Sequence, residues 1–476
     1  MPRLDPSAPA LAWETLLDLG DAPLPLRDRL ERAVREAVQA GRIPAGAALP
    51  PSRSLAETLG VSRWVVTEVY GQLVAEGLLE AAVGSGTRVP ATSRPSAFGG
   101  PVAPPVRGEF RRPRYDLGPG VPDLRHVPRA RWADAVRHAL TNLPDGEFAV
   151  VDRLGHPLAR TAVASYLTRS RRAVAAPDDV VITHGATDAM LAIARGLHRG
   201  GHRTLLVEDP SWPRLREVAA GMGLVPVPVT VDGDGVDVDR LADAASRTGA
   251  RAALITPAHQ FPTGAALAPA RREAIVRWAR SVDAVLVEDD YDAEFRYDRR
   301  PVAALQGMAP ERTVLIGSLS KSVSPALGLG WAVMPAALRE RIRLGEAARP
   351  STLDQAALAR FIDSGDLERH LRAARGRFRR RRTELLAAIA SELPGLAVTG
   401  IAAGMHAVLA LPAGVRGSDA AEAAGTLGVA VSALARYRAS AASNAPEALV
   451  LGYGNLSDAL VDEAVAHLAW SIRSLV

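Results

Sequence analysis

One lysine stands alone among the basic residues of this 476-residue chain. Of its 57 lysine and arginine residues, only Lys321 is a lysine. A guanidinium group stays protonated under ordinary conditions and cannot form an imine with a carbonyl compound, whereas a lysine amine can. Lys321 follows an apolar run at residues 313–316 and a short turn that contains Ser318. Its amine is therefore the candidate nucleophile.

Four further apolar runs, at residues 180–182, 204–207, 252–255 and 284–287, also end in short turns that carry functional groups. Those turns hold Gly185, Ala186, Thr187, Trp212, His259, Gln260, Asp289 and Tyr291. Because the runs are apolar throughout and alternate with helical stretches, they predict an α/β fold with a mostly parallel sheet. Ligands of such sheets bind beyond the carboxyl ends of the strands, so these turns and Lys321 are expected around one site.

The residue types in these turns match what pyridoxal 5'-phosphate requires. A lysine imine, an acid at the pyridine nitrogen, an aromatic ring over the pyridine and donors for the phosphate are its usual partners. Lys321 supplies the amine, Asp289 the acid, Tyr291 a partner for the phenolic oxygen and Trp212 the stacking ring. We expect Ser318 to bind the phosphate together with the helix start at Gly185, Ala186 and Thr187, because backbone amides at a helix start bind anions.

Each of these motifs also has an ordinary structural interpretation. A tryptophan is more often a packed aromatic, acidic turns are usually solvated, and Gly-Ala-Thr at a helix start is usually a cap. The occurrence of all of them after successive apolar runs, with the only lysine among them, favours the cofactor.

Composition excludes several other classes of protein. The chain has no cysteine, so it has no disulfide, thiolate nucleophile or cysteine metal site, and its ten histidines show no HExxH spacing. We expect no metal centre. The longest apolar stretch, residues 326–338, is too short to cross a membrane, and we expect a cytoplasmic protein without membrane partners. The net charge of +5 is small for this length.

The composition changes sharply at residues 90–114, a segment rich in proline and arginine that is typical of an extended linker. It separates an N-terminal domain, residues 1–89, from residues 115–476, whose last part, from about 365, is expected to form a smaller α+β subdomain. Apolar spacing predicts a helix from Leu26 to near Gly41, a second from a Ser52 cap to Leu59, and a third from a Ser62 cap to about Glu76. A glycine-bearing hairpin follows, so this domain reads as a winged helix-turn-helix.

The stretch LPPSRSLAETLGVSRWVVTEVYGQL, followed by GSGTRV, resembles the GntR-type winged helix. The resemblance implies binding of double-stranded DNA and places one set of residues at or near it. The set is Arg53, Ser62, Arg63, Thr67, Gly84 and Gly86. One departure concerns Trp64 and Val65, which stand where the family usually carries a small polar pair.

The motifs THGATDAM, EDPSWPRL, TPAHQFPTG, EDDYDAEF and SLSKSVSPALGLGW resemble, in order, fold-type I aminotransferases as found in MocR/GabR-type regulators. The resemblance covers nearly the whole chain. It implies a homodimeric transcription regulator in which a pyridoxal phosphate-dependent, aminotransferase-like domain senses an amine or the cofactor itself. It also adds His259 and Gln260 to the expected cofactor residues.

Two departures weaken the expectation of enzymatic activity. The family carries an arginine for the phosphate seven residues after the lysine, where this chain has Gly328, so the cofactor is expected to exchange more easily. The late stretch LVLGYGNLSD lacks the arginine that binds a substrate carboxylate in aminotransferases, and Arg436 and Arg438 are the nearest substitutes. Two alternatives to a cofactor-dependent regulator are a working aminotransferase with an accessory DNA-binding head and a regulator that has lost the cofactor and binds another small ligand. The basic run from Arg369 to Arg382 fits a solvated helix face better than a nucleic-acid patch.

Overall fold

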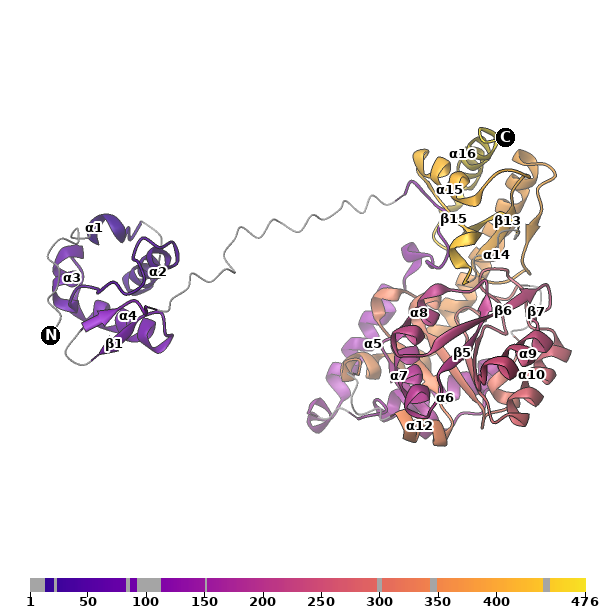
Figure 1. The fold of residues 1–476 in the computed structure, drawn as a ribbon, viewed down its shortest axis with the longest axis horizontal. Helices are drawn as coiled ribbons and strands as arrows, with labels where there is room; N and C mark the ends of the chain where they lie inside the picture. The colour runs from indigo at the N-terminus through magenta and orange to yellow at the C-terminus, as the bar shows by residue number, and fades with distance from the viewer. Residues whose placement is uncertain are drawn as a thin grey trace. The chain divides into compact units, whose positions relative to one another are not determined.

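The computed structural model describes residues 13–20, 24–82, 86–91, 113–149, 152–297, 302–342, 349–439 and 446–476. Backbone contacts divide the chain into two compact units, Met1–Phe110 and Arg111–Val476 (Figure 1).

The N-terminal unit is a small helical domain with a two-stranded wing. Its elements are α1 (Trp13–Leu16), α2 (Leu26–Gln39), α3 (Ser52–Leu59), α4 (Arg63–Ala75), β1 (Glu80–Ala82) and β2 (Gly86–Arg88). The stripes predicted from the sequence meet in one core, where Leu30, Val34, Leu55, Val66 and Leu73 are fully buried. The winged helix-turn-helix prediction is confirmed.

Caps and turns fix the angle between α3 and α4. Gly60 ends α3 in a left-handed conformation with φ 64°, and the Ser62 hydroxyl accepts a hydrogen bond from the Val65 amide, so Ser62 caps α4 as predicted. The predicted Ser52 cap is wrong. Pro51 occupies that position and Ser52 is the first helical residue, because the fixed φ of proline already sets the chain direction at the helix entry.

The larger unit is built on an eight-stranded mixed sheet of order β4-β11-β10-β9-β8-β5-β6-β7. The strands are β4 (Val180–Thr183), β5 (Thr204–Asp209), β6 (Val225–Asp232), β7 (Gly235–Val236), β8 (Ala252–Ile255), β9 (Val285–Asp289), β10 (Thr313–Ser318) and β11 (Gly330–Val333). All five predicted strands are present. Strands β5, β6, β8, β9 and β10 pair in parallel, whereas β11 runs antiparallel to both β10 and β4. The predicted α/β fold with a mostly parallel sheet is confirmed.

Helices cover both faces of this sheet. One face packs on α7 (Ala186–Arg199), α8 (Pro213–Gly221) and α12 (Ala336–Ile342), and the other on α9 (Val238–Thr248) and α10 (Pro269–Ser281). Figure 1 shows α9 and α10 on one side of β5 and β6, with α7 and α8 on the other side. Because both faces are covered, the strand ends are the places where polar side chains reach solvent.

A second, smaller sheet of order β12-β13-β16-β15 lies late in the chain. Its strands are β12 (Val398–Thr399), β13 (His406–Ala410), β15 (Ser432–Ala433) and β16 (Ala448–Gly452). Helices α14 (Asp366–Glu392), α15 (Gly417–Thr426) and α16 (Val461–Arg473) accompany this small sheet. Helix α13 (Thr352–Asp363) packs on α5 (Arg129–Asn142) and α6 (Pro157–Arg171), and α6 packs on β4 of the large sheet. The early strand β3 (Tyr115–Asp116) pairs with β14 (Val429–Ala430), which joins the start of this unit to its small-sheet region. Among the described residues, no helix is long and apolar enough to span a membrane.

Candidate functional site

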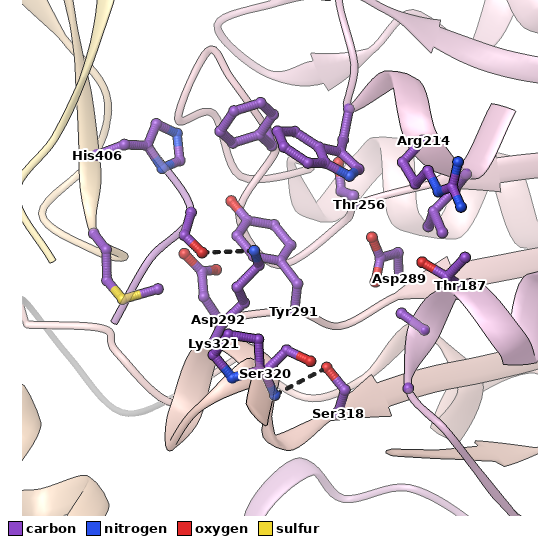
Figure 2. Close-up of a pocket in the computed structure, with 18 of the residues that line it drawn as sticks. Thr187, Arg214, Thr256, Asp289, Tyr291, Asp292, Ser318, Ser320, Lys321 and His406 are labelled. Atoms are coloured by element: carbon purple, nitrogen blue, oxygen red, sulfur yellow. Dashed lines mark hydrogen bonds between the residues drawn. The ribbon is translucent and has the colours of Figure 1, made fainter. Parts of the chain in front are cut away.

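The turns that follow the strands of the large sheet meet around one cavity of about 280 Å³ (Figure 2). Eight of the ten predicted cofactor residues line it: Gly185, Ala186, Thr187, Trp212, Asp289, Tyr291, Ser318 and Lys321. The remaining lining residues are Gly120, His184, Arg214, Leu215, Thr256, Phe261, Asp292, Ser320, Pro325, Met405 and His406. The cavity therefore combines an amine, carboxylates, aromatic rings and hydroxyl groups, as the strand-end argument anticipates.

Lys321 lies on α11 (Leu319–Ser322), directly beyond β10. Its Nζ donates a hydrogen bond of 2.6 Å to the carbonyl oxygen of Gly120, and burial lowers the pKa of the amine. Gly120 has φ +92°, and a Cβ at that position would lie 3.1 Å from Nζ. The glycine therefore allows the chain to pass close to the amine, and the lowered pKa increases the neutral, nucleophilic fraction.

Asp289 is the last residue of β9 and lies in the wall of the same cavity. Its side chain is buried, and its Oδ1 has no hydrogen-bond partner. Burial raises the pKa of this carboxyl to about 7, the neighbouring Asp290 adds to the rise, and Lys321 opposes it. A buried carboxylate without a partner is costly, so this position suits a cationic group such as a protonated ring nitrogen.

Two aromatic side chains border the space between Lys321 and Asp289. The Trp212 ring centroid lies 5.6 Å from the Lys321 Nζ, and its indole also stacks on Tyr437 with centroids 6.1 Å apart. The Tyr291 hydroxyl lies 3.2 Å from Nδ1 of His259, and burial raises the pKa of the phenol well above its ordinary value. Tyr291 therefore stays protonated and can donate a hydrogen bond to an anionic oxygen.

The N-terminus of α7 forms another wall of the cavity. Gly185 precedes the helix with φ +117°, and Ala186 and Thr187 provide the first helical amides. Ser318 caps α11 by accepting a hydrogen bond of 3.4 Å from the Ser320 amide. Free amides and hydroxyl groups at the start of a 14-residue helix make a binding site for a phosphate.

Gly328 follows Lys321 by seven residues and is not among the described residues that line the cavity. It has φ +59°, and a Cβ at this position would meet nothing within 4 Å. An arginine here would not clash at Cβ, but it would have to adopt the left-handed conformation that glycine adopts readily.

The structure places His259 and Gln260 behind the cavity wall rather than in its lining. The Gln260 amide nitrogen donates to the carbonyl oxygens of Pro210 and Phe261 at 2.8 and 2.7 Å, and its side-chain oxygen accepts from Thr263. Its polar atoms thus join neighbouring loops. Phe261, the next residue along the chain, faces the cavity instead.

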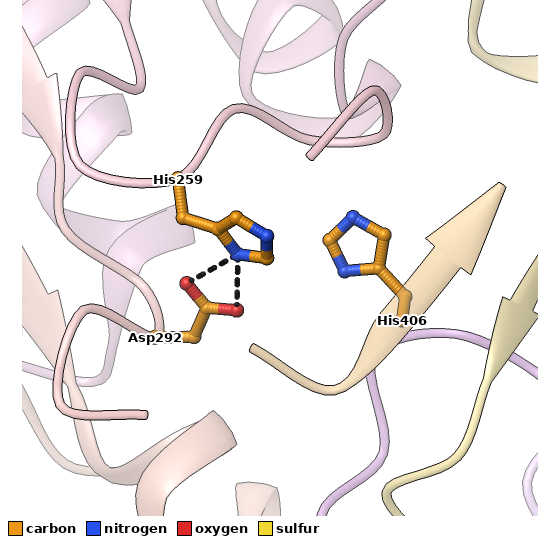
Figure 3. A group of neighbouring side chains, drawn as sticks. All are labelled: His259, Asp292 and His406. Atoms are coloured by element: carbon orange, nitrogen blue, oxygen red, sulfur yellow. Dashed lines mark hydrogen bonds and ion pairs between the residues drawn. The ribbon is translucent and has the colours of Figure 1, made fainter. Parts of the chain in front are cut away.

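His259 belongs to a buried cluster with Asp292 and His406 (Figure 3). Its Nδ1 lies 2.9 Å from the Asp292 carboxylate, and the two imidazole centroids are 4.8 Å apart. Burial and the neighbouring His259 lower the pKa of His406 well below its ordinary value. His406 is therefore neutral, and the cluster supports Tyr291 and the small-sheet wall of the cavity.

The predicted DNA-binding residues gather around α3 and α4. Arg53 and Arg63 are both exposed; Arg53 pairs with Glu57 at 3.3 Å, and the Nε of Arg63 lies 3.4 Å from the Ser52 hydroxyl. Thr67 donates to the backbone oxygen of Arg63 at 2.9 Å.

The structure also describes part of the wing and both residues of the departure at Trp64 and Val65. Gly86 begins β2 with φ +79°, whereas Gly84 lies outside the described residues. Trp64 is 65% exposed, while Val65 packs against the core. Val65 therefore has a structural role, and Trp64 is the surface residue at the start of α4.

Comparisons with known proteins agree with both halves of this description. Residues 26–89 match the family described as bacterial regulatory proteins of the gntR family, and residues 115–468 match Aminotransferase class I and II. An archaeal alanine:glyoxylate aminotransferase has the same fold, with a TM-score of 0.70 and 22% identity over 76% of this chain and 91% of that one.

Curated relatives combine the two halves as this chain does. The HTH-type pyridoxine biosynthesis transcriptional regulator PdxR of Corynebacterium glutamicum is 32% identical over 81% of this chain and 83% of its own length. The probable rhizopine catabolism regulatory protein MocR of Rhizobium meliloti is 34% identical over 75% of each. The chain therefore belongs to the MocR-type transcriptional regulators, in which a GntR-type helix-turn-helix domain is joined to a domain of the aminotransferase class I and II family.

Proposed function

We propose that this regulator holds pyridoxal 5'-phosphate at Lys321 and changes its affinity for an operator when the cofactor, or an amine that reacts with it, binds. The observation that carries the proposal is one juxtaposition. The Lys321 amine and the buried Asp289 carboxyl, whose Oδ1 has no hydrogen-bond partner, border one cavity, with the Trp212 ring 5.6 Å from the amine. These are the groups that the cofactor's carbonyl, ring nitrogen and ring face require.

When bound, pyridoxal phosphate supplies a reactive carbonyl carbon joined to an electron-accepting ring. The side chains of this protein then have separate tasks. Lys321 offers an amine whose pKa is lowered by burial, and Asp289 holds the ring nitrogen in its protonated form. The Tyr291 hydroxyl donates a hydrogen bond to the phenolic oxygen of the cofactor. The amides at Ala186 and Thr187 bind its phosphate.

The names of the relatives support a ligand of this chemical class. PdxR is named for pyridoxine biosynthesis, and a Salmonella typhimurium relative that is 28% identical over 66% of this chain is a vitamin B6 salvage pathway transcriptional repressor. MocR is named for the catabolism of rhizopine. Pyridoxal phosphate itself and a small amine are therefore the two effector classes that we propose for this chain.

Ligand binding can reach the DNA-binding head because the cavity has walls from two sheets. Strand ends of the large sheet carry Asp289 and Ser318, whereas Met405 and His406 come from β13 and the turn before it. A ligand that fits one arrangement of these walls better than another shifts the population toward that arrangement. In a homodimer, which we also propose, such a shift changes how two heads meet double-stranded DNA.

Borohydride reduction tests the cofactor at its proposed attachment site. We expect the purified protein to be yellow after incubation with pyridoxal phosphate, and reduction followed by peptide mass mapping to place the adduct on Lys321. Because the chain has one lysine, the α-amino group is the only competing amine, and Lys321→Ala is the matched control. An adduct on the α-amino group alone, or none with excess cofactor, would contradict the proposal. Operator titrations with and without the cofactor test the regulatory half.

A further inference from the structure

The end of the cavity around α7 has no arginine from the loop that follows Lys321. Gly328 ends η6 (Pro325–Leu327), and no atom lies within 4 Å of where its Cβ would be. The groups that remain there are the α7 amides and the hydroxyls of Thr187, Ser318 and Ser320. These groups are neutral, and the same cavity contains the carboxylates of Asp289 and Asp292. A cation from another element would add to the binding that these amides and hydroxyls provide and would offset the two carboxylates.

Arg214 is the only guanidinium among the described residues that line the cavity. It lies in the first turn of α8, two residues after Trp212. In Figure 2, Arg214 lies on the same side of the cavity as Thr187 and Asp289, whereas His406 lies across from them.

The bonding of Arg214 differs from that of Arg216 on the same helix. Arg216 donates hydrogen bonds to the carbonyl oxygens of Ser211, Tyr437 and Arg438 and so fastens two parts of the fold. Arg214 is exposed and makes no hydrogen bond or ion pair with any described residue. Its guanidinium is therefore available to a ligand.

We propose that Arg214 binds the phosphate group of pyridoxal phosphate and replaces the arginine that is absent at position 328. This inference rests on the proposed function. The buried, unpartnered Oδ1 of Asp289 independently indicates a ligand with a cationic ring in the same cavity. One ligand with a cationic ring and an anionic phosphate satisfies both Asp289 and Arg214, and a planar guanidinium can bind phosphate with two parallel hydrogen bonds.

The position of Arg214 has a consequence for how tightly the ligand is held. An arginine at position 328 would lie in the loop after Lys321, whereas Arg214 is a long, exposed side chain in the first turn of α8. Ordering that side chain on the ligand costs conformational entropy, and salt screens an exposed ion pair. Binding of pyridoxal phosphate is therefore expected to weaken with ionic strength, as suits a ligand that is sensed rather than permanently bound.

The test compares pyridoxal phosphate with pyridoxal, which has the same ring and carbonyl but no phosphate. Affinities of the full-length protein are measured by absorbance titration for wild type, Arg214→Gln and Arg247→Gln, the last removing an exposed arginine of α9. We expect Arg214→Gln to lower the affinity for pyridoxal phosphate by about 10- to 100-fold. Its affinity for pyridoxal should stay within about twofold of wild type. Arg247→Gln should change neither. Gly328→Arg added to Arg214→Gln should recover part of the lost affinity, with a cost in stability because φ at position 328 is +59°.

The outcomes separate this inference from the proposed function. Unchanged pyridoxal phosphate affinity in Arg214→Gln, or equal losses for both ligands, would overturn the role of Arg214 while leaving Lys321 as the attachment site. Failure of the wild-type protein to form any adduct at Lys321 would overturn the proposed function itself. If Arg214→Gln does not fold, as judged by circular dichroism, Arg214→Lys takes its place. That variant keeps the charge but cannot form two parallel hydrogen bonds to the phosphate. It should still lower the affinity for pyridoxal phosphate more than the affinity for pyridoxal.

Discussion

At the scale of single residues, Asp289 carries an ionisation cost that depends on pH. Its pKa lies near 7 in the folded protein, against 3.8 ordinarily, because the carboxyl is buried beside Asp290. Between these two values the folded protein keeps a proton that the unfolded chain has lost. The free energy of unfolding therefore falls as the pH rises from about 4 to about 7, and the loss is on the order of 4 kcal/mol.

Asp289→Asn should remove that dependence, because the amide does not ionise. We expect urea denaturation of the ligand-free variant to show a smaller loss of stability between pH 5 and pH 8 than wild type shows. Glu208 and Glu288, whose pKa values burial also raises to about 7, are present in both proteins, so the difference between the two profiles reports Asp289 and its repulsion with neighbours such as Glu208. The exposed Asp243→Asn is the control and should follow wild type. Parallel pH profiles for wild type and Asp289→Asn would show that the carboxyl already has a partner.

Arg63 is the residue on which sequence-specific DNA binding is expected to depend. It is exposed at the first position of α4, beside Thr67 and Trp64. Arg63→Ala should weaken operator binding by about 1–3 kcal/mol and relax specificity if the guanidinium contacts a base, or lower the salt slope by roughly one if it contacts a phosphate. Fluorescence anisotropy at several salt concentrations distinguishes these cases, with the exposed Arg32→Ala on α2 as control. An unchanged titration would remove Arg63 from the interface.

The sequence predicted one class of site residue well and another poorly. Residues such as Lys321 and Asp289 follow apolar strands, and parallel strands bring their carboxyl ends together whatever the connections between them. Gly120 and His406 belong to other parts of the chain, before the large sheet and on β13, and only tertiary packing brings them to the cavity. Arg214 is one of so many arginines in the chain that its residue type alone does not mark it as a site residue. Its separation of two residues from Trp212 was the one available clue.

At the scale of elements, α14 shows why a basic run is a poor indicator of nucleic-acid binding. Arg381 is buried and donates to Asp123, Asp458 and the backbone oxygens of Tyr453 and Gly454. Arg375 and Arg382 likewise donate to backbone oxygens, so these arginines fasten the helix to its surroundings. The exposed members are Arg369, Arg372, Arg379 and Arg380. The helix is therefore partly an internal brace and partly a solvated face.

Arg381→Ala should destabilise the protein by about 3–5 kcal/mol, because it leaves the buried Asp123 without a buried charge partner. The pKa of Asp123 is held at about 2: burial opposes ionisation, but hydrogen bonds from Arg125 and Arg381 outweigh it. Its stabilising contribution is therefore present above pH 4 and is lost as the pH falls toward 2. Urea denaturation near pH 7 measures the loss. Arg379→Ala, on the same helix but exposed, should stay within about 0.5 kcal/mol of wild type. Equal effects from the two substitutions would contradict the bracing role.

The strands that sequence analysis missed differ physically from those that it predicted. Strands β8, β9 and β10 are short, apolar and covered on both faces, and such runs are readily recognised. Strand β6 contains two prolines and is largely exposed, so it lacks the apolar run. Strand β11 begins with glycine and runs antiparallel between β10 and β4. Its place is determined by hydrogen bonding to these two strands, which the local sequence does not reveal.

At the scale of the whole molecule, the question is whether the cavity serves turnover or sensing. Transamination requires that an amino acid be held with one bond of its α-carbon aligned to the Lys321 amine, and a clamp on its carboxylate supplies much of that alignment. The small-sheet wall offers Met405 and a neutral His406, and neither Arg436 nor Arg438 lines the cavity. Arg438 instead donates to the backbone oxygen of Pro446. If Arg214 holds the phosphate, no other guanidinium among the described lining residues remains for the substrate.

We therefore expect amines to change the absorbance of the cofactor-loaded protein, or its affinity for the operator, without sustained transamination. The measurement is a panel of amino donors with a keto-acid acceptor, followed over many equivalents of substrate per protein, with Lys321→Ala as the control for background exchange. Product formation should stop near one equivalent per protein, or continue far more slowly than the turnover numbers of ordinary enzymes, which are about 1–10³ per second. A donor that sustains turnover at such rates would show that another group aligns the substrate, and the protein would then be an aminotransferase carrying a DNA-binding head. A donor that shifts the spectrum and the operator titration at the same concentration, without turnover, would identify the amine that this regulator senses.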